Sequence, residues 1–412
     1  MKAIKLLPLL LLAAFSCQKP LFPGTPRWMR MQDRYKYLEA DGPSAPDSAG
    51  SPLDHRPVVY MTALRFPEGV DWRNGEREGA RLVLWKDGEE VLDLPGGHYP
   101  EPDRHRVRGG HLWQDDSDGS VTRIFLDGEE ILQYEGDEIL RGLLLEGEDL
   151  HTLGQRVGGE GFSYRINGEE VYSHPLGRIS GTFEDREWEG GALMQDGDGV
   201  YYSCALPIRK ENAVSWEHRL MKGDELVLKI TETEAKTVFD IRVWNGSVYR
   251  SEQRGDNSGS FMLVKDQLAH ALGSGLEGQT VHLCRLVPDG KQMLVKGYSS
   301  KNSLYSYWFR GTDGPSGEIR SSFLLADLYL DNPLLAAISL DKGLVRNIYD
   351  GEKNLNLPAR KYALRTKACS AYKDGVLYAV LTDMSGDGHL LLKGDEFETF
   401  TFNGCFTGIW IE

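Results

Sequence analysis

The feature that most constrains the fold is a tight turn that recurs at a fixed interval. The sequences WKDGEEV, FLDGEEI and RINGEEV place their glycines 40 residues apart, at Gly88, Gly128 and Gly168. Asp-Gly and Asn-Gly supply the positive φ angles that the two central positions of a β-hairpin need, and alternating apolar residues flank each turn. The three segments therefore predict three copies of one hairpin.

A second kind of hairpin alternates with the first. Its turns carry Asp-Gly or Asn-Gly at 196–197, 245–246, 289–290 and 374–375. Two hairpins in each repeat give four antiparallel strands, and a period of 40 to 55 residues lies in the range of propeller blades. Residues 57–412 hold seven or eight such periods; we favour seven, with eight as the alternative, because residues 318–360 break the rhythm.

This pattern resembles the β-propeller repeat proteins, over residues 57–412. The resemblance implies an all-β fold, a single β-propeller with four-stranded antiparallel blades, and a ring closed by its first and last strands. We expect the segment 402–411 to pair beside the segment 58–66. Two packed β-sandwich domains are the rival fold, although they would not require an equal spacing of 40 residues.

The amino-terminal residues have the pattern of an export signal. Lys2 and Lys5 precede an apolar run that is too short to span a bilayer. Ala14 and Ser16 stand just before Cys17, which resembles the lipobox of bacterial lipoproteins and implies a signal at 1–16 and a lipid attached to Cys17. Gln18 favours the outer membrane, on its periplasmic or cell-surface side. The proline-rich residues 17–56 then read as a tether.

The net charge and the cysteine content limit the ligands, metal sites and disulfides that this chain can have. The formal net charge of −15 makes nucleic acid an unlikely ligand, because such a surface repels phosphate backbones. Beyond Cys17 the chain has four cysteines, and their spacing fits no Cys-x-x-Cys metal site. Buried free thiols are favoured over a disulfide; the four are Cys204, Cys284, Cys369 and Cys405.

A metal site is one candidate for local chemistry. His98, His105 and His111 lie within fourteen residues and offer imidazole ligands for a divalent ion. The spacing fits no usual zinc motif, and a solvated loop between blades explains the histidines as well. We therefore expect no cofactor, and keep the three histidines as a candidate metal site.

A sugar-binding site is the other candidate. Trp188 stands beside Glu187 and Asp185, and Trp72 lies in a second loop. A tryptophan face can stack on a sugar ring while nearby acids accept hydrogen bonds from its hydroxyl groups. The alternative is that each tryptophan packs on its own blade.

The sequence leaves three functions open. The first is a non-catalytic envelope lipoprotein, held at the membrane by its lipid and monomeric, that binds a glycan or an envelope protein through a propeller face. The second is a glycan-active hydrolase or lyase with acidic residues in the central funnel. The third is a scaffold component of an envelope complex. Because motifs such as HExxH and GxSxG are absent from the sequence, we lean away from an enzyme.

Overall fold

A computed structural model describes residues 57–412. Its gaps fall at residues 75–77, 96–103, 158–160, 180–191, 198, 211–212, 234–235, 256–259, 274–279, 287–291, 300–303, 312–316, 322–323, 332–333, 342–343 and 350–352.

The described residues form eight antiparallel sheets, which we number I to VIII from the amino terminus. Sheet I contains, from its inner to its outer strand, β34 (Gly404–Ile411), β1 (Val59–Arg65), β2 (Arg81–Lys86) and β3 (Glu89–Pro95). Sheet II contains β4 (His105–Arg108), β5 (His111–Ser117), β6 (Val121–Leu126) and β7 (Glu129–Glu135). Sheet III contains β8 (Glu138–Glu146), β9 (Asp149–Arg156), β10 (Phe162–Ile166) and β11 (Glu169–His174).

Sheet IV contains β12 (Arg178–Ile179), β14 (Gly199–Lys210), β15 (Ala213–Lys222) and β16 (Glu225–Thr231), and β13 (Leu193–Asp196) also pairs with β14. Sheet V contains β17 (Lys236–Trp244), β18 (Ser247–Arg254), β19 (Ser260–Lys265) and β20 (Leu268–Gly273). Sheet VI contains β21 (Thr280–Leu286), β22 (Gln292–Ser299), β23 (Leu304–Gly311) and β24 (Gly317–Ser321).

Sheet VII contains β25 (Leu324–Asp331), β26 (Leu334–Asp341), β27 (Leu344–Tyr349) and β28 (Asn354–Leu355). Sheet VIII contains β29 (Tyr362–Ala363), β31 (Val376–Asp383), β32 (Gly388–Lys393) and β33 (Glu396–Thr401), and β30 (Ser370–Lys373) also pairs with β31. The helical elements among the described residues are two short 3₁₀ turns, η2 (Trp72–Asn74) and η3 (Lys367–Cys369). No described helix has the length and apolar character that a membrane crossing requires.

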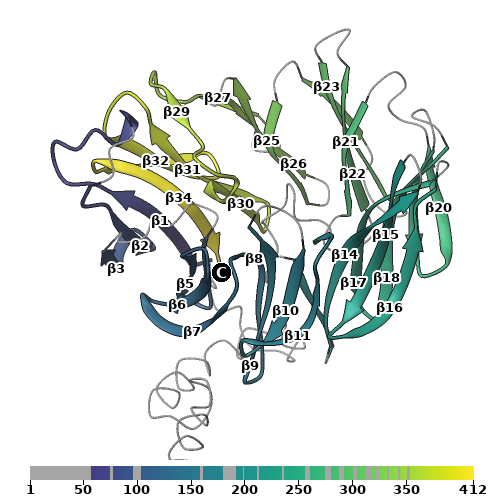
Figure 1. The fold of residues 1–412 in the computed structure, drawn as a ribbon. Helices are drawn as coiled ribbons and strands as arrows, with labels where there is room; N and C mark the ends of the chain where they lie inside the picture. Colours follow the sequence, from purple (N-terminus) through teal and green to yellow (C-terminus); the bar gives the residue numbers. More distant parts are fainter. Residues whose placement is uncertain are drawn as a thin grey trace, which may run out of the picture.

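The sheets follow one another around a ring in the order of the sequence, and the last sheet lies next to the first (Figure 1). The protein is therefore a β-propeller, and the prediction of four-stranded antiparallel blades is confirmed. The favoured count of seven blades is wrong for the described residues, which form eight. Sheet VII is the blade that was missed, because its first two hairpins lack the Asp-Gly and Asn-Gly turns by which the other blades were counted.

The two ends of the domain share sheet I, as predicted. Strand β34 pairs antiparallel with β1, with Val59 opposite Ile411 and Arg65 opposite Gly404. The side chains of Thr62 and Thr407, 345 positions apart, are joined by a hydrogen bond of 2.8 Å. The ring is thus closed by backbone pairing between its first and last segments.

The core lies between neighbouring sheets rather than within any one of them. Leu82 and Leu84 of sheet I pack with Leu112 of sheet II, and Ile124 of sheet II packs with Leu143 of sheet III. Strand β6 alternates strictly between half-buried and buried residues, as a strand with one face on a core must. The outermost strand β3 is largely exposed, because no sheet covers its outer edge.

The predicted hairpin turns have the expected backbone. Asp87 and Gly88 both have positive φ, at 50° and 85°, and so do the residues at 127–128, 167–168, 245–246 and 374–375. The side chain of the first residue in several of these turns also accepts a hydrogen bond from the second strand of its own blade. The Val59 amide donates to Asp87 Oδ1 at 2.9 Å, and the Leu112 amide donates to Asp127 Oδ1 at 2.9 Å. The same anchor joins Leu150 to Asn167 and Val248 to Asp266.

These connections divide the ring into two faces. The turns between the first and second strands and between the third and fourth strands of each blade lie at one end of the strands, which we term the hairpin face. The remaining connections, including residues 66–80, 118–120, 384–387 and 402–403, lie at the other end, which we term the loop face. Strand β1 begins at the hairpin face, beside the turn at Asp87, and ends at the loop face.

Candidate functional site

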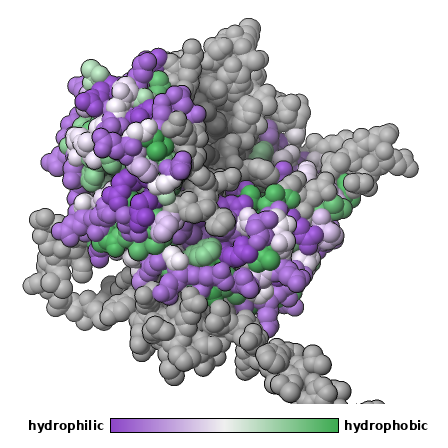
Figure 2. All heavy atoms as spheres, turned by 60° about the vertical axis from the view of Figure 1, so that its left-hand side comes forward, coloured by the Kyte–Doolittle hydropathy of each residue, from purple (hydrophilic) through white to green (hydrophobic). Residues whose placement is uncertain are grey.

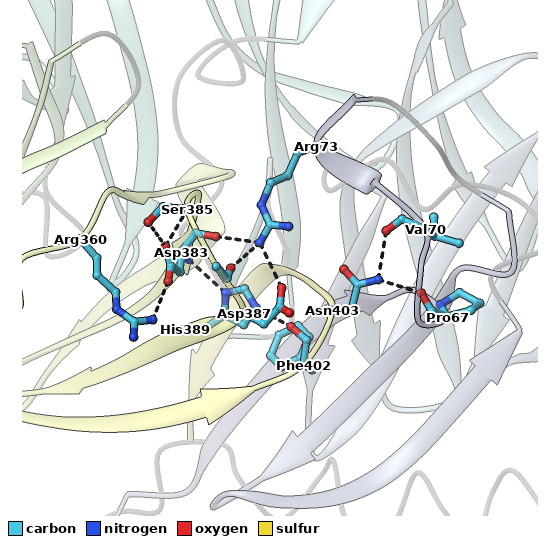
Figure 3. Close-up of polar contacts among 11 residues, drawn as sticks. Pro67, Val70, Arg73, Arg360, Asp383, Ser385, Asp387, His389, Phe402 and Asn403 are labelled. Atoms are coloured by element: carbon cyan, nitrogen blue, oxygen red, sulfur yellow. Dashed lines mark hydrogen bonds and ion pairs between the residues drawn. The ribbon is translucent and has the colours of Figure 1, made fainter.

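A shallow, open hollow of about 400 Å³ lies on the loop face between sheets I and VIII. The loop between β1 and β2 supplies one side of it, the loop between β31 and β32 supplies the other, and the connection from β33 to β34 completes it (Figure 3). The hollow is lined by Glu68, Gly69, Val70, Asp71, Arg73, Met384, Ser385, Asp387 and Asn403. Ring closure brings these loops together, although more than 300 residues separate them.

Trp72 holds the first loop from the inside. It is 2% exposed, and its ring stacks on Phe66 with centroids 6.3 Å apart. The guanidinium carbons of Arg73 and Arg365 lie 4.5 and 5.8 Å from the centre of the Trp72 ring. Because these neighbours cover the ring, Trp72 has no face to offer a sugar, and the stacking role expected of it is corrected to a packing role.

Arg73 connects the two loops across the hollow. Its Nη2 donates to the backbone carbonyl of Gly386, to that of Asp383 at 3.2 Å and to Asp387 Oδ1 at 3.2 Å (Figure 3). A guanidinium is suited to this role because its N–H groups point in several fixed directions in one plane. Arg73 therefore fixes the position of the loop at 384–387 relative to η2.

Asn403 fixes the beginning of the loop between β1 and β2. Its Nδ2 donates to the Pro67 carbonyl at 2.7 Å and to the Val70 carbonyl at 3.0 Å. One amide thus satisfies two carbonyl groups that the turn at 67–70 directs toward β34. Together Asn403 and Arg73 make the walls of the hollow a hydrogen-bonded frame.

Asp383 forms the base of the second loop. Its carboxylate is buried: Oδ1 accepts hydrogen bonds from the amide and the hydroxyl of Ser385, both at 2.8 Å, and Oδ2 accepts from Arg360 at 2.8 Å. Burial acts to raise the pKa of Asp383, but the hydrogen bonds from Ser385 and Arg360 outweigh it and hold the pKa below its ordinary value. Asp383 is therefore an ionised structural anchor.

His389 lies behind this loop in a single protonation state. The Asp383 amide donates to its Nδ1 at 3.0 Å, so that Nδ1 must be the acceptor, and Nε2–H then donates to the Phe402 carbonyl at 2.9 Å. The ring is fully buried, and burial lowers its pKa. A neutral imidazole with both nitrogens occupied by backbone groups positions the loop and has no access to a ligand.

The hollow itself offers a mixture of polar groups. Carboxylates of Glu68, Asp71 and Asp387 and the Ser385 side chain line it, together with the apolar side chains of Val70 and Met384. Figure 2 shows that the surface on this side of the molecule is mainly hydrophilic, with small and separate apolar areas. Such a surface can bind the hydroxyl groups of a sugar or the polar side chains of a protein.

The other predicted sugar-binding residues fall in a segment that the structure does not describe. Trp188, Glu187 and Asp185 lie in the segment 180–191, outside the described residues. The residues that form the frame were missed by the sequence analysis, because Arg73 and Asn403 are ordinary loop residues whose partners are more than 300 positions away in the chain. The one usable signal was the predicted pairing of residues 402–411 with 58–66, which already placed these loops side by side.

The candidate metal site is not supported where it is described. Arg108 lies opposite His111 in the β4–β5 pair, so their side chains share a face of the sheet, whereas His105, three positions from Arg108, points to the opposite face. His105 Nε2 is hydrogen-bonded to the hydroxyls of Thr62 and Thr407, and His111 Nδ1 to Asp127 at 2.7 Å.

His98 lies outside the described residues. In the part of the chain that the structure describes, no three His, Cys, Asp or Glu side chains are close enough together to hold a metal ion. The expectation of buried thiols outside disulfides is confirmed for Cys204, Cys369 and Cys405, which are buried and form no disulfide.

Comparisons with known proteins find solved structures that are similar to this chain at low sequence identity. No protein-family model matches this chain, and no curated protein matches it. Among solved structures, the dihydro-heme d1 dehydrogenase NirN is similar over 90% of this chain and 78% of its own, with 10% identity and a TM-score of 0.48.

Two further structures are similar at lower scores. The polysaccharide lyase Uly1 is similar over 85% of this chain and 98% of its own, with 11% identity and a TM-score of 0.39. The β-propeller domain of the Trilobed protease from Pyrococcus furiosus is similar over 71% of this chain and 91% of its own, with 8% identity and a TM-score of 0.38.

Proposed function

We propose that this protein is an envelope lipoprotein, held at the outer membrane by lipid on Cys17, that binds a glycan or an envelope protein through the loop face of its propeller without catalysing a reaction. It acts as a monomer on the periplasmic or cell-surface side. Nucleic acid is not its partner, and it needs no cofactor.

The direction of strand β1 is the observation that carries this proposal. The chain enters the domain at Val59, on the hairpin face, and the loop that follows Arg65 forms the hollow on the opposite face. A strand of seven residues spans about 20–25 Å, so the attachment point and the hollow are separated by the height of a blade. An anchor before residue 57 would therefore be attached at the hairpin face, with the hollow on the opposite face of the domain.

The acidic charge of the hairpin face favours a position of the domain some distance from the membrane surface. Its repeated turns carry pairs of acidic residues, at 89–90, 129–130 and 169–170, and further acids at 148–149 and 224–225. Anionic lipid head groups repel such a face over about one Debye length. The tether of residues 17–56 would hold the domain at a distance where this repulsion is small.

The anchor is tested by Cys17→Ala in the producing bacterium. We expect the wild-type protein to fractionate with membranes and to carry an acyl mass on its amino-terminal peptide, and the variant to lose both. A Cys17→Ala protein that still partitions with membranes would contradict the lipid anchor.

Ligand binding is tested with the detergent-solubilised full chain on a glycan array. Glu68→Ala and Asp387→Ala change the hollow, and Glu148→Ala on the hairpin face is the matched control. Binding that is lost in the first two variants and kept in the control supports the proposal. Release of shortened glycan would instead identify a hydrolase or lyase, and co-purification of an envelope complex without glycan binding would identify a scaffold.

A further inference from the structure

His389 on β32 links the two parts of the frame that surrounds the hollow. Its Nδ1 accepts a hydrogen bond from the Asp383 amide at 3.0 Å, and its Nε2–H donates to the Phe402 carbonyl at 2.9 Å (Figure 3). The carbonyl of Asp383 in turn accepts a hydrogen bond from Arg73 at 3.2 Å, and Phe402 immediately precedes Asn403 in the chain. One imidazole ring is therefore joined to both residues, Arg73 and Asn403, that hold the walls of the hollow.

Both partners of the ring are backbone groups, and their roles are fixed. A backbone N–H can only donate and a carbonyl can only accept, so the ring must supply one acceptor and one donor. A neutral imidazole meets this demand, whereas a protonated ring carries an N–H on both nitrogens. A proton on Nδ1 would thus face the Asp383 N–H, and two donors would stand where one hydrogen bond of 3.0 Å now lies.

Two other buried histidines have partners that tolerate a second proton. The Nδ1 atom of His151 lies 2.6 Å from the Tyr164 hydroxyl, which can turn from donor to acceptor. The Nε2 atom of His218 lies 3.0 Å from a carboxylate oxygen of Glu232, which accepts. His389 differs from both, because neither of its partners can change its role.

The surroundings of His389 are unfavourable for a charged ring. The side chain is fully buried and packs against the rings of Phe402 and Phe406, whose centroids lie 4.2 and 5.8 Å from its own. A cation in such surroundings loses the solvation that it has in water. The folded domain therefore stabilises the neutral ring.

The charged groups that face His389 come from neighbouring elements. They are Asp383 at the end of β31, Asp387 on the loop that follows, and Arg73 in η2. Burial lowers the pKa of His389 below the ordinary value of 6.5 and Arg73 adds to this, while the Phe402 carbonyl and the two carboxylates oppose it only in part. The folded domain thus excludes this proton to a lower pH than a free histidine does, so acid favours states in which the ring has left its partners.

Asp383 transmits a change at His389 to the hollow. Its amide binds the ring, its carbonyl binds Arg73, and its carboxylate binds Ser385, which lines the hollow. An amide that has lost its acceptor is costly to leave buried, so the backbone at Asp383 must turn to find another partner. This movement changes the bonds to Arg73 and Ser385 as well, and the loop at 384–387 loses its fixed position.

We propose that His389 is a pH switch of the hollow: its protonation in acid opens the frame between Arg73 and the loop at 384–387 and releases the bound ligand. The two states differ by one proton, so a return to neutral pH restores the frame. The release of ligand rests on the proposed function, whereas the opening of the frame does not.

Hydrogen exchange measured by mass spectrometry on the detergent-solubilised full chain tests the opening without any ligand. Labelling times are scaled between pH 7.5 and pH 4.5 so that the intrinsic effect of pH on exchange cancels. We expect residues 383–389 and 402–404 to lose protection at the lower pH and to regain it at the higher one, while residues 149–156 of sheet III stay protected. Wild-type protein whose residues 383–389 keep full protection at pH 4.5 overturns the proposal.

His389→Gln assigns the effect to this ring. The glutamine side chain stays neutral in acid and carries both an acceptor and a donor, so the folded variant should show the same protection of residues 383–389 at both pH values. His389→Asn is used in the same way if the glutamine variant does not fold. His218→Gln is the matched control: it removes another buried histidine and should lose protection at 383–389 in acid as the wild type does. A folded His389 variant that still loses this protection overturns the proposal, and so does a His218→Gln protein that keeps it.

Ligand affinity gives a separate readout. A glycan that the array identifies at neutral pH should bind the wild type about tenfold or more weakly at pH 4.5, and should bind folded His389→Gln equally at both pH values. Unchanged affinity in the wild type contradicts the release of ligand by the switch. An array without any bound glycan contradicts the proposed function instead, and the exchange measurement still decides whether the frame opens.

Discussion

Leu112 and Asp127 are joined by a reciprocal pair of hydrogen bonds: the Leu112 amide donates to the Asp127 carboxylate at 2.9 Å, and the Asp127 amide donates to the Leu112 carbonyl at 2.8 Å. Leu150 and Asn167 repeat this pair in the next blade, at 2.8 and 2.9 Å. The residue in the turn between the third and fourth strands thus forms hydrogen bonds to the second strand of the same blade. These bonds join the three strands to one another.

The anchor at Asn167 should contribute to stability in two separable ways. Asn167→Ala loses the hydrogen bond to Leu150 and also places an alanine at a φ of 52°, so we expect a loss of about 2–3 kcal/mol in the free energy of unfolding. Asn167→Gly loses the hydrogen bond but tolerates the backbone, and should cost about 1 kcal/mol. Urea unfolding of both variants checks this; equal losses would contradict the separation.

Ring closure should be sensitive to a single methyl group at Gly404. A Cβ atom built there would lie 2.0 Å from the Leu64 carbonyl oxygen, so β34 must move away from β1 to accept it. We expect Gly404→Ala to cost more than about 3 kcal/mol, as overpacking against a backbone does. Gly246→Ala is the matched control: its Cβ would meet open space at a φ of 70°, and the cost should stay near 1–2 kcal/mol. Similar thermal midpoints for the two variants would show that the contact is easily relieved.

Stability should depend on the protonation of Asp115. Burial raises its pKa from 3.8 to about 6, although Arg106 and Arg104 oppose the shift, so the folded protein holds this proton more tightly than the unfolded chain. Stability from this group is therefore present below about pH 4 and is lost as the pH rises to about 6, by an amount on the order of 2–3 kcal/mol.

The Asp115→Asn variant has no carboxyl group at this position, so its stability should not depend on pH in this way. Urea unfolding of wild type and variant between pH 4 and 7 gives the difference in their free energies of unfolding, in which titrations shared by both proteins cancel. We expect the wild type to lose stability relative to the variant as the pH rises. A difference that stays constant with pH would contradict the raised pKa.

The frame of the hollow should loosen when Asn403 is replaced. Asn403→Ala removes the two hydrogen bonds to the Pro67 and Val70 carbonyls, and should cost about 1–2 kcal/mol because water can replace only part of them. Hydrogen exchange measured by mass spectrometry should increase in residues 66–74, while residues 149–156 of sheet III keep their protection. Faster exchange throughout the chain would mean that the variant destabilises the whole domain instead.

Local turn chemistry allowed most of the fold to be predicted. Asp87–Gly88 and Asn167–Gly168 needed positive φ at both positions, and few dipeptides other than Asp-Gly and Asn-Gly meet that need. The blade at 324–355 was missed for the same reason, since its strands are apolar but its first two hairpins carry other residues. Strand content and turn identity are separate signals, and the predicted number of blades relied on turn identity alone.

The candidate site was harder to predict, because its contacts are long-range. Arg73 and Asp387 are 314 positions apart, and nothing in the sequence near either residue indicates the other. For Trp72 the alternative prediction, that the ring packs on its own blade, is the one that the structure supports, because a short 3₁₀ turn directs the ring inward against Phe66.

The shared sheet I also sets an order of events during biogenesis. Strands β1 to β3 are synthesised early, yet the inner edge of β1 has no partner until β34 emerges, some 345 residues later. For that interval the backbone of β1 is an open template with which a neighbouring nascent chain can pair. A protein of this design therefore benefits from a holding chaperone that shields its earliest strands, and truncation near the carboxyl terminus damages the portion that was made first.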